Sequence, residues 1–445
     1  MNYKEYFKDK KITVMGLGLL GRGVGDAAFL AECGAQVIVT DLKSKEELAE
    51  SVARLEQYEN ITFVLGEHRE EDFKGRDFIL VAAGVPQDSH YLSVARMQGI
   101  PLKQSAAWFA ELSKVPVVGV TGTRGKSTVT AMIHHTLSVV TGEKVLLGGN
   151  VRGLSNLQLL KEVKEDSLCV MELDSWQLQG WGWNNMSPQI AVFTNFMEDH
   201  QNYYHSMDKY FLDKAQIFLH QEDSDVLVTT PEVFERIKTL PGSLGQQVLL
   251  VDASVIPEDA NLAMPGEHNR LNAALAYKAL EALSLSETEI FSGLASFPGV
   301  EGRLQYVGEV HGVRVYNDNN ATTPQATVEG LKAVGGTNNM VLIIGGTDKE
   351  LDLGQLPAAI QKHCAHVILY SGSGTEKLKE VLPKSVSFEE HDTFTACVEA
   401  ALATAVTGNT ILFSPAFASF NKEFKNEYER NDAFLQSLKQ YGNDS

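Results

Sequence analysis

The segment 117–128 carries the clearest chemistry in the chain, because the apolar run VVGV leads into TGTRGKST. Gly122 and Gly125 let the backbone curl so that its N–H groups face an anion, and a helix N-terminus after them adds partial positive charge. Lys126 can reach the outer phosphates, and the Ser127 hydroxyl is placed to bind Mg²⁺. We therefore expect a nucleoside triphosphate site with contacts from Gly122, Thr123, Gly125, Lys126, Ser127 and Thr128.

This loop is a variant of the general phosphate-loop pattern. Val120 stands where the general pattern has glycine, and Gly119 and Gly122 flank it. A chance Gly-Lys-Ser is the alternative in a chain with 37 glycines. The apolar run before the loop and its two well-placed glycines favour the phosphate site.

Three side chains further along are candidates for metal or phosphate chemistry. Glu172 follows the apolar run 168–171 and is a natural second magnesium ligand beside Ser127, although acids at strand ends are also common on solvated surfaces. His200 follows another apolar run and Asn195, and it could bind a metal or a phosphate or be structural. Lys214 could bind a metal only if its charge were removed, as in a carbamate formed with CO₂; composition does not suggest this, and the alternative is a surface lysine. Glu172 and Asn195 are expected near the phosphate loop, because ligands gather at the carboxyl ends of parallel strands.

A second glycine cluster lies near the start of the chain. Gly16, Gly18 and Gly21 follow an apolar run, and Asp41 comes twenty residues later. The pattern is typical of a dinucleotide site with the aspartate on a ribose hydroxyl, and equally of a tight strand–helix turn that binds no nicotinamide. We favour a nucleotide diphosphate, because a separate triphosphate loop argues against a simple dehydrogenase.

Polar residues in the second half suggest two more contact regions. Asn269 and Asn272 lie three apart at an expected helix start, where they could hold adenine or ribose or act as a cap. The polar segments 317–324, 345–349 and 414–420 each follow an apolar run and should share one sheet edge. They offer Lys349 as a fixed cation and several hydroxyls, which suits the carboxylate of an amino acid.

The elements that must position these residues form three blocks of alternating strands and helices, the pattern of an α/β protein with parallel sheets. Strands are expected at 11–15, 36–40, 78–82, 168–171, 190–193, 313–316, 340–344, 366–370 and 410–413. The segment 297–302 resembles a linker. We expect domains at 1–105, 106–299 and 300–445.

Composition narrows the function classes. The 445 residues carry a net charge of −19 without a visible basic cluster, so nucleic acid is not an expected partner. No apolar run reaches membrane length, the start lacks a signal core, and the four cysteines are scattered, which together predict a cytoplasmic protein without membrane contact. Because the net negative charge of the protein repels anions, a few local cations would have to hold any anionic ligand.

Seven segments in the same order resemble the Mur ligase family over residues 16–426: Gly-Leu-Gly, TGTRGKST, Gly148-Gly149-Asn150, Glu-Leu-x-Ser-x-Gln-Leu, Glu-Asp-His, Gly-x-His-Asn and Ser-Pro-x-x-Ala-Ser-Phe. This family uses ATP to join an amino acid to a peptidoglycan precursor. The resemblance implies a Rossmann-like N-terminal domain for the UDP moiety, a central P-loop ATPase-type parallel-sheet domain, and a C-terminal Rossmann-like domain for the amino acid. It is strongest to members that add D-glutamate to UDP-N-acetylmuramoyl-L-alanine through an acyl phosphate.

The resemblance also implies roles for individual residues. The catalytic set would be Lys126, Glu172, His200 and Lys214. Two Mg²⁺ would be bound, one by Ser127 and Glu172 and the other by His200 and a carbamylated Lys214. ATP would also contact Asn269, Asn272, Arg303 and Asp318. The UDP precursor would contact Gly18, Leu19, Leu20, Asp41, Asn150 and Ser175. The incoming amino acid would contact Thr322, Lys349 and Ser419, and the protein would be a monomer.

Four departures from the family pattern bear on activity. Asp174 stands where serine is usual, so that a carboxylate could repel the precursor or add a metal ligand. Asn320 replaces a frequent lysine, Arg124 replaces an asparagine, and the segment 420–426 is one residue longer. The alternatives are a related ligase for another amino acid, such as L-glutamate, or for a folate-type substrate, and a non-catalytic homologue that binds a nucleotide sugar. The retained Lys126 and Lys214 weigh against the last.

Overall fold

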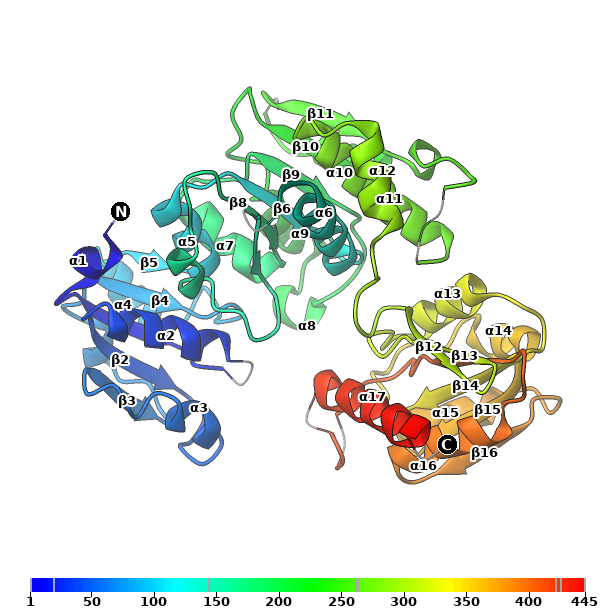
Figure 1. Ribbon diagram of the computed structural model, residues 1–445. Helices are drawn as coiled ribbons and strands as arrows, with labels where there is room; N and C mark the ends of the chain where they lie inside the picture. The colour runs from blue at the N-terminus through cyan, green and yellow to red at the C-terminus, as the bar shows by residue number, and fades with distance from the viewer. Residues whose placement is uncertain are drawn as a thin grey trace. The chain divides into compact units, whose positions relative to one another are not determined.

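The computed structural model describes residues 2–18, 21–142, 145–242, 244–260, 262, 264–420, 422–424 and 426–443. The chain is an α/β protein with three sheets (Figure 1). It divides into two compact units. The first unit contains residues 1–257 and 272–294, and the second contains residues 258–271 and 295–445. The α/β fold predicted from the sequence is therefore confirmed.

The first sheet is parallel throughout, with the strand order β3-β2-β1-β4-β5. Its strands are β1 (Lys11–Met15), β2 (Gln36–Asp41), β3 (Ile61–Leu65), β4 (Phe78–Val81) and β5 (Leu102–Lys103). The helices are α1 (Tyr3–Phe7), α2 (Arg22–Glu32), α3 (Ala49–Ala53) and α4 (His90–Met97), with a 3-10 turn η1 (Glu70–Phe73). The turn between β1 and α2 lies at the carboxyl edge of this sheet, where it was expected.

The second sheet is also parallel, with the order β11-β10-β9-β6-β8-β7. Its strands are β6 (Val117–Thr121), β7 (Val145–Gly149), β8 (Leu168–Glu172), β9 (Ile190–Phe193), β10 (Val226–Thr229) and β11 (Gln247–Leu250). Its helices include α5 (Ser105–Ser113), α6 (Lys126–Thr141), α7 (Ser175–Trp183), α8 (Gln201–Tyr204), α9 (Met207–Ala215), α10 (Pro231–Ile237), α11 (Glu267–Ala282) and α12 (Glu287–Ala295), with 3-10 turns η2 (Gln158–Lys161) and η3 (Ala253–Val255).

The first and second sheets share one continuous apolar core within the first unit. The ring of Phe7 packs edge-on against Trp108 of α5, with ring centroids 5.2 Å apart. A buried polar connection adds to this contact, because the Asp26 carboxylate of α2 accepts hydrogen bonds from the Ser155 hydroxyl (2.6 Å) and the Leu157 amide (3.1 Å). The turn before α2 is thereby fixed relative to the central sheet.

The third sheet has the order β12-β13-β17-β14-β15-β16. Its strands are β12 (Gln305–Val310), β13 (Val313–Asn317), β14 (Met340–Gly345), β15 (Cys364–Tyr370), β16 (Phe388–His391) and β17 (Thr410–Phe413), of which β12 is antiparallel to β13 and the others are parallel. Its helices are α13 (Pro324–Val334), α14 (Leu356–His363), α15 (Ser373–Val381), α16 (Phe394–Thr404) and α17 (Glu427–Asn443). The proposed domain boundaries stay predictions.

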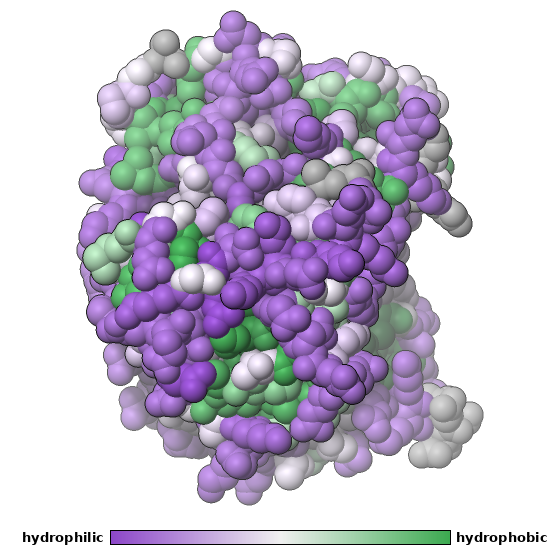
Figure 2. All heavy atoms as spheres, turned by 90° about the vertical axis from the view of Figure 1, so that its left-hand side faces the viewer, coloured by the Kyte–Doolittle hydropathy of each residue, from purple (hydrophilic) through white to green (hydrophobic). Residues whose placement is uncertain are grey.

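No described helix is both long and apolar enough to cross a membrane. The face shown in Figure 2 is mainly hydrophilic, with smaller hydrophobic areas between the polar side chains. Cys33, Cys169, Cys364 and Cys397 are buried and form no disulfide.

Candidate functional site

The phosphate loop occupies the turn between β6 and α6 and needs its glycines. Gly122 has φ +145°, and a Cβ there would overlap the Thr194 hydroxyl. Gly125 has φ +81°, and a Cβ there would lie 2.5 Å from Oδ1 of Asn272. Only glycine satisfies both the left-handed backbone and this close packing. The strand–turn–helix arrangement predicted for residues 117–128 is confirmed.

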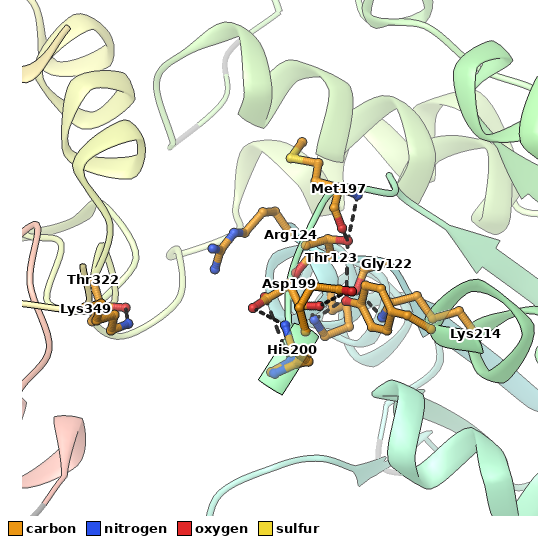
Figure 3. A network of polar contacts seen from close by, with 12 residues as sticks. Gly122, Thr123, Arg124, Met197, Asp199, His200, Lys214, Thr322 and Lys349 are labelled. Atoms are coloured by element: carbon orange, nitrogen blue, oxygen red, sulfur yellow. Dashed lines mark hydrogen bonds and ion pairs between the residues drawn. The ribbon is translucent and has the colours of Figure 1, made fainter. Parts of the chain in front are cut away.

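The segment after β9 holds this loop in shape (Figure 3). The Arg124 amide donates to Oδ1 of Asn195 (2.8 Å), and the Thr194 hydroxyl donates to the Arg124 carbonyl (2.6 Å). The Thr123 hydroxyl accepts from the Met197 amide (3.0 Å) and donates to the Met197 carbonyl (3.2 Å). Asn195 therefore lies beside the phosphate loop, as its place after a parallel strand predicted.

Two lysines meet at the carbonyl of Gly122. Lys126 Nζ donates to this carbonyl and to that of Thr123, both at 3.1 Å. Lys214 of α9 is 1% exposed, donates to the Gly122 carbonyl at 2.7 Å and lies 4.8 Å from the ring centroid of Tyr210. Burial, and then the charge of Lys126, lower the pKa of Lys214 well below its usual value. The composition-based expectation of a surface lysine is therefore wrong.

Glu172 ends β8, which pairs directly with β6. Its carboxylate is 7% exposed and accepts a hydrogen bond from Nδ2 of Asn150 (3.3 Å). The backbone N–H of Asn150 in turn donates to the backbone carbonyl of Glu172 (2.7 Å). Ser127 lies in the first turn of α6, which follows β6 through the phosphate loop, so the two proposed magnesium ligands follow neighbouring strands of one sheet. A hydroxyl, a carboxylate and substrate phosphates are the ligands that Mg²⁺ prefers.

His200 is the N-cap residue of α8 and has a left-handed backbone, φ +53°. Its ring lies 4.6 Å from the Trp176 ring, and its Nε2 is 3.9 Å from an oxygen of Asp199. Burial lowers the pKa of His200, so its imidazole is neutral at pH 7 and can present a lone pair. Within the described part of the chain, no three His, Cys, Asp or Glu side chains are grouped to hold a metal. His200 and Lys214 as metal ligands stay a proposal.

Asp174 has a structural explanation that its departure from the family pattern did not suggest. Its carboxylate accepts from the Gln177 amide (2.8 Å), and the Gln177 side chain reaches back to the Asp174 amide. This is a capping box at the start of α7, in which Asp and Ser are about equally effective. Ser175, the first residue of that helix, is buried.

The glycine-rich turn after β1, which we call the precursor turn because the resemblance assigns it to the UDP precursor, has left-handed backbone at Gly16, Gly18 and Gly21. Asp41, at the end of β2, accepts hydrogen bonds from the amides of Leu17 (2.9 Å) and Gly18 (3.3 Å), so that its carboxylate braces the turn. Leu19 and Leu20 lie outside the described residues. The contact of Asp41 with a ribose stays a prediction.

In the second unit, the residues expected to bind the incoming amino acid lie at the carboxyl edge of the third sheet. Lys349, after β14, donates to the Thr322 hydroxyl at 2.9 Å (Figure 3). Ser419 is buried in the segment after β17. A cation and two hydroxyls thus come from segments that follow three strands of one sheet, as the sequence predicted. Their contact with an amino acid stays a prediction.

Asp318 is a buried carboxyl at the same edge. It accepts from the Leu304 amide (3.0 Å) and the Ser414 hydroxyl (2.9 Å), and its side chain is enclosed. Burial raises the pKa of Asp318 to about 7, while the hydrogen bonds and the charge of Arg303 act in the opposite direction. Arg303 is half-buried next to the segment 297–302, which contains neither helix nor strand.

The two asparagines of α11 fall in different units. Asn269 belongs to the second unit and donates from Nδ2 to the Pro265 carbonyl (2.8 Å). Asn272 belongs to the first unit and packs against Gly125 of the phosphate loop. The expected helix is confirmed, and the structure places Asn272 next to the loop. Adenine recognition stays a prediction.

Sequence reasoning missed two residues at this site. Arg22 of α2 donates from Nη1 to Oδ1 of Asn150, which links the precursor turn to Glu172. Tyr210 supplies the ring above Lys214. The four-residue spacing of Tyr210 and Lys214 on one helix was a usable signal, whereas the partner of Arg22 lies 128 residues away along the chain.

A parallel sheet with a phosphate loop, combined with a sheet that carries a Gly-rich turn, defines a nucleotide-binding α/β protein. Three family models match the chain: the MurD-like N-terminal domain of Mur ligases at 10–103, the Mur ligase middle domain at 120–238, and the Mur ligase glutamate ligase domain at 302–417. The chain belongs to the Mur ligase family, which confirms the resemblance drawn from its motifs.

Full-length relatives and solved structures agree with this assignment. The chain is 33% identical over 458 residues to UDP-N-acetylmuramoylalanine--D-glutamate ligase of Borreliella burgdorferi strain ZS7, covering 98% of this chain and 99% of the relative. The enzyme of the same name from Roseiflexus sp. strain RS-1 is also 33% identical, over 97% and 99%.

Two solved structures share the fold. MurC of Thermotoga maritima, a UDP-N-acetylmuramate-alanine ligase, gives a TM-score of 0.60 at 19% identity over 97% of this chain and 99% of that one. MurF of the same organism, in complex with ADP, gives 0.59 at 16% identity over 99% and 97%. At these identities the likeness shows the fold alone.

Proposed function

We propose that the chain is an ATP-dependent ligase that joins D-glutamate to UDP-N-acetylmuramoyl-L-alanine in peptidoglycan precursor synthesis. The observation that carries the proposal is full-length similarity to enzymes of that name, at 33% identity, combined with a formed phosphate loop beside Glu172. ATP, D-glutamate and the UDP precursor are the proposed substrates. A cytoplasmic monomer, with domains at 1–105, 106–299 and 300–445, completes the proposal.

The first chemical step is activation of the precursor. A carboxylate oxygen of its L-alanine attacks the γ-phosphorus of ATP, the bond to the bridging oxygen of ADP breaks, and an acyl phosphate forms. The loop amides and Lys126 stabilise the negative charge that spreads over the transferring phosphoryl group. Ser127 and Glu172 would hold one Mg²⁺, which neutralises phosphate charge when bound.

The second step forms the amide bond. The amino nitrogen of D-glutamate attacks the acyl carbon, and the tetrahedral intermediate expels phosphate, which leaves with the former carboxylate oxygen. The attacking amine nitrogen gives up one proton to solvent in this step, so that the amide formed is neutral. Thr322, Lys349 and Ser419 are the proposed partners of the amino-acid carboxylates, because a cation and hydroxyls are the groups that pair with carboxylate.

Lys214 is proposed to act as a carbamate. Its lowered pKa favours the neutral amine, whose lone pair can attack the carbon of CO₂, with loss of one proton to give an anionic carbamate. The carbamate oxygens would change this side chain from a donor on the Gly122 carbonyl into an oxygen ligand. Together with His200 it would then hold the second Mg²⁺.

The test is product formation by the purified chain with ATP, Mg²⁺ and UDP-N-acetylmuramoyl-L-alanine, comparing D-glutamate, L-glutamate and other amino acids. We expect phosphate release and a new amide product with D-glutamate alone. Lys126→Ala should be slower by on the order of a hundredfold, because it removes charge stabilisation of the phosphoryl group. Turnover with L-glutamate would indicate a different ligase, and precursor binding without any turnover would indicate a non-catalytic homologue.

A further inference from the structure

Arg22 is a cation in an unusual place. It is the first residue of α2, whose N-cap Gly21 provides no side-chain cap and whose first turn contains no acidic residue. A helix N-terminus carries partial positive charge, so a cation there is unfavourable unless an anion binds beside it. In a chain of net charge −19, a cation placed on a glycine-rich turn points to an anionic ligand.

The Arg22 side chain lines a cavity of about 180 Å³ within the first unit. The same cavity is lined by Gly16 and Gly18 of the precursor turn and by Gln104, which precedes α5. Gln104 is 2% exposed, and its Nε2 has no hydrogen-bond partner among the described residues. A buried amide donor without an acceptor is costly. Gln104 is therefore a second indication, independent of the helix, that a ligand rich in acceptor oxygens enters this cavity.

The present partners of Arg22 explain why the cavity is poised for an anion. Its guanidinium donates from Nη1 to Oδ1 of Asn150, which is a neutral group. Its charge also acts on the buried Asp26 carboxyl, where it opposes the rise in pKa that burial causes. Asp26, the carboxylate on the cavity wall, has its Oδ1 engaged by the Ser155 hydroxyl and the Leu157 amide. A guanidinium group can donate to two phosphate oxygens at once, and these charge-assisted hydrogen bonds are stronger than one to the carbonyl of a neutral amide.

We propose that Arg22 binds the pyrophosphate of the UDP precursor, and that Asn150 is its partner only while the precursor is absent. This inference rests on the proposed function, and it adds a residue that specifies the diphosphate. The backbone N–H groups of the first turn of α2, which have no acceptor within the helix, would bind the same anion. Gln104 would donate to an oxygen of the nucleotide sugar.

The experiment measures binding by calorimetry to the full chain, with UDP-N-acetylmuramoyl-L-alanine, UDP, uridine and ATP as separate probes. Arg22→Leu should weaken the precursor and UDP by about tenfold to a hundredfold, the range for a charged hydrogen bond, and change uridine and ATP by less than about twofold. Arg22→Lys keeps the positive charge without the forked guanidinium, and it should weaken binding of the precursor and UDP less than Arg22→Leu does. The matched control is Arg54→Leu, an exposed cation beside Gly21 that lines a different groove, and it should leave all four affinities unchanged.

The outcomes separate this inference from the proposed function. If the wild-type chain binds UDP and the precursor, and Arg22→Leu binds them equally well, the assignment of Arg22 is wrong and the ligase proposal stands. If the variant loses uridine and UDP to the same extent, or loses kcat with unchanged precursor affinity, Arg22 acts through the structure or through Asn150 and the inference also fails. A wild-type chain that binds neither UDP nor the precursor overturns the proposed function itself.

Discussion

Gly149 offers a direct test of how tightly the end of β8 must be held. It ends β7 with φ +84°, beside the strand end that carries Glu172. A Cβ at this position would lie 2.8 Å from the Glu172 carbonyl carbon and closer still to its oxygen, whereas ordinary contacts begin at 3.4 Å. The Glu172 carbonyl oxygen would lie only 2.0 Å from the new Cβ, so Gly149→Ala must move the two strand ends apart by about 1 Å or more, because they pack without free space.

Two effects of this substitution can be worked out separately. The left-handed backbone costs alanine about 1–2 kcal/mol of stability. The substitution also displaces Glu172 and the Asn150 backbone N–H that donates to it. This displacement should lower kcat, because misplacing a reacting group by about 1 Å can slow a reaction about a hundredfold. We expect kcat to fall by about tenfold to a hundredfold, while ATP affinity stays within about threefold because the phosphate loop is untouched.

Gly153→Ala is the matched control. Gly153 lies in the connection that follows β7 and has φ +71°, but a Cβ there meets nothing within 4 Å. The Gly153→Ala variant should therefore have the backbone strain without the displacement of Glu172. Its stability should fall, and its kcat should stay unchanged. The assay is phosphate release at saturating substrates, with thermal unfolding followed by tryptophan fluorescence, since all four tryptophans lie in the first unit. Equal kcat values for Gly149→Ala and Gly153→Ala would refute this reasoning.

Three other predictions test single side chains. Lys214→Ala should lose most activity and regain part of it with added acetate, which supplies the missing carboxylate; rescue by ammonium instead would contradict the carbamate. Burial raises the pKa of Asp318 to about 7, so the native state keeps a proton that the unfolded chain loses above its usual value of 3.8. The free energy of unfolding of the third sheet should therefore fall by on the order of 2 kcal/mol between pH 5 and 7 and stay level above pH 7. Hydrogen exchange of the β14 amides measures this fall, which should vanish in Asp318→Asn. Asp174→Ala should cost about 1 kcal/mol of unfolding free energy and Asp174→Ser about none, as measured by urea unfolding; a tighter precursor KM in Asp174→Ser would contradict a purely capping role.

The sequence predicted the strands and loops of this fold well where local patterns decide the structure. Apolar runs ending in Glu172, Asn195 and Asp318 identified parallel strands and the edges at which polar groups meet. Seven strands were not predicted, and all of them except β10 lie at the edges of their sheets: β3, β5, β7, β10, β11, β12 and β16. In β12, for example, the residues alternate at the edge of the sheet without a buried face. Antiparallel edge strands of this kind carry a weak apolar signal.

The environments of individual side chains were harder to predict, because they depend on packing between distant segments. The local sequence of α9 gives Lys214 the pattern of an ordinary charged residue, yet its Nζ is buried against the Gly122 carbonyl of the phosphate loop. The bond from Arg22 to Asn150 joins two sheets, and no local pattern encodes it. Asp174 departed from the family pattern, but its spacing to Gln177 contained the capping box.

The most direct test of the ligase chemistry follows one oxygen atom. The proposed mechanism transfers a carboxylate oxygen of the precursor to phosphate when the acyl phosphate is attacked by D-glutamate. With a precursor labelled by ¹⁸O in its alanine carboxylate, we predict that each phosphate released carries one ¹⁸O, detected by ³¹P NMR. Amide product formed with unlabelled phosphate would contradict activation of the precursor by ATP at this site.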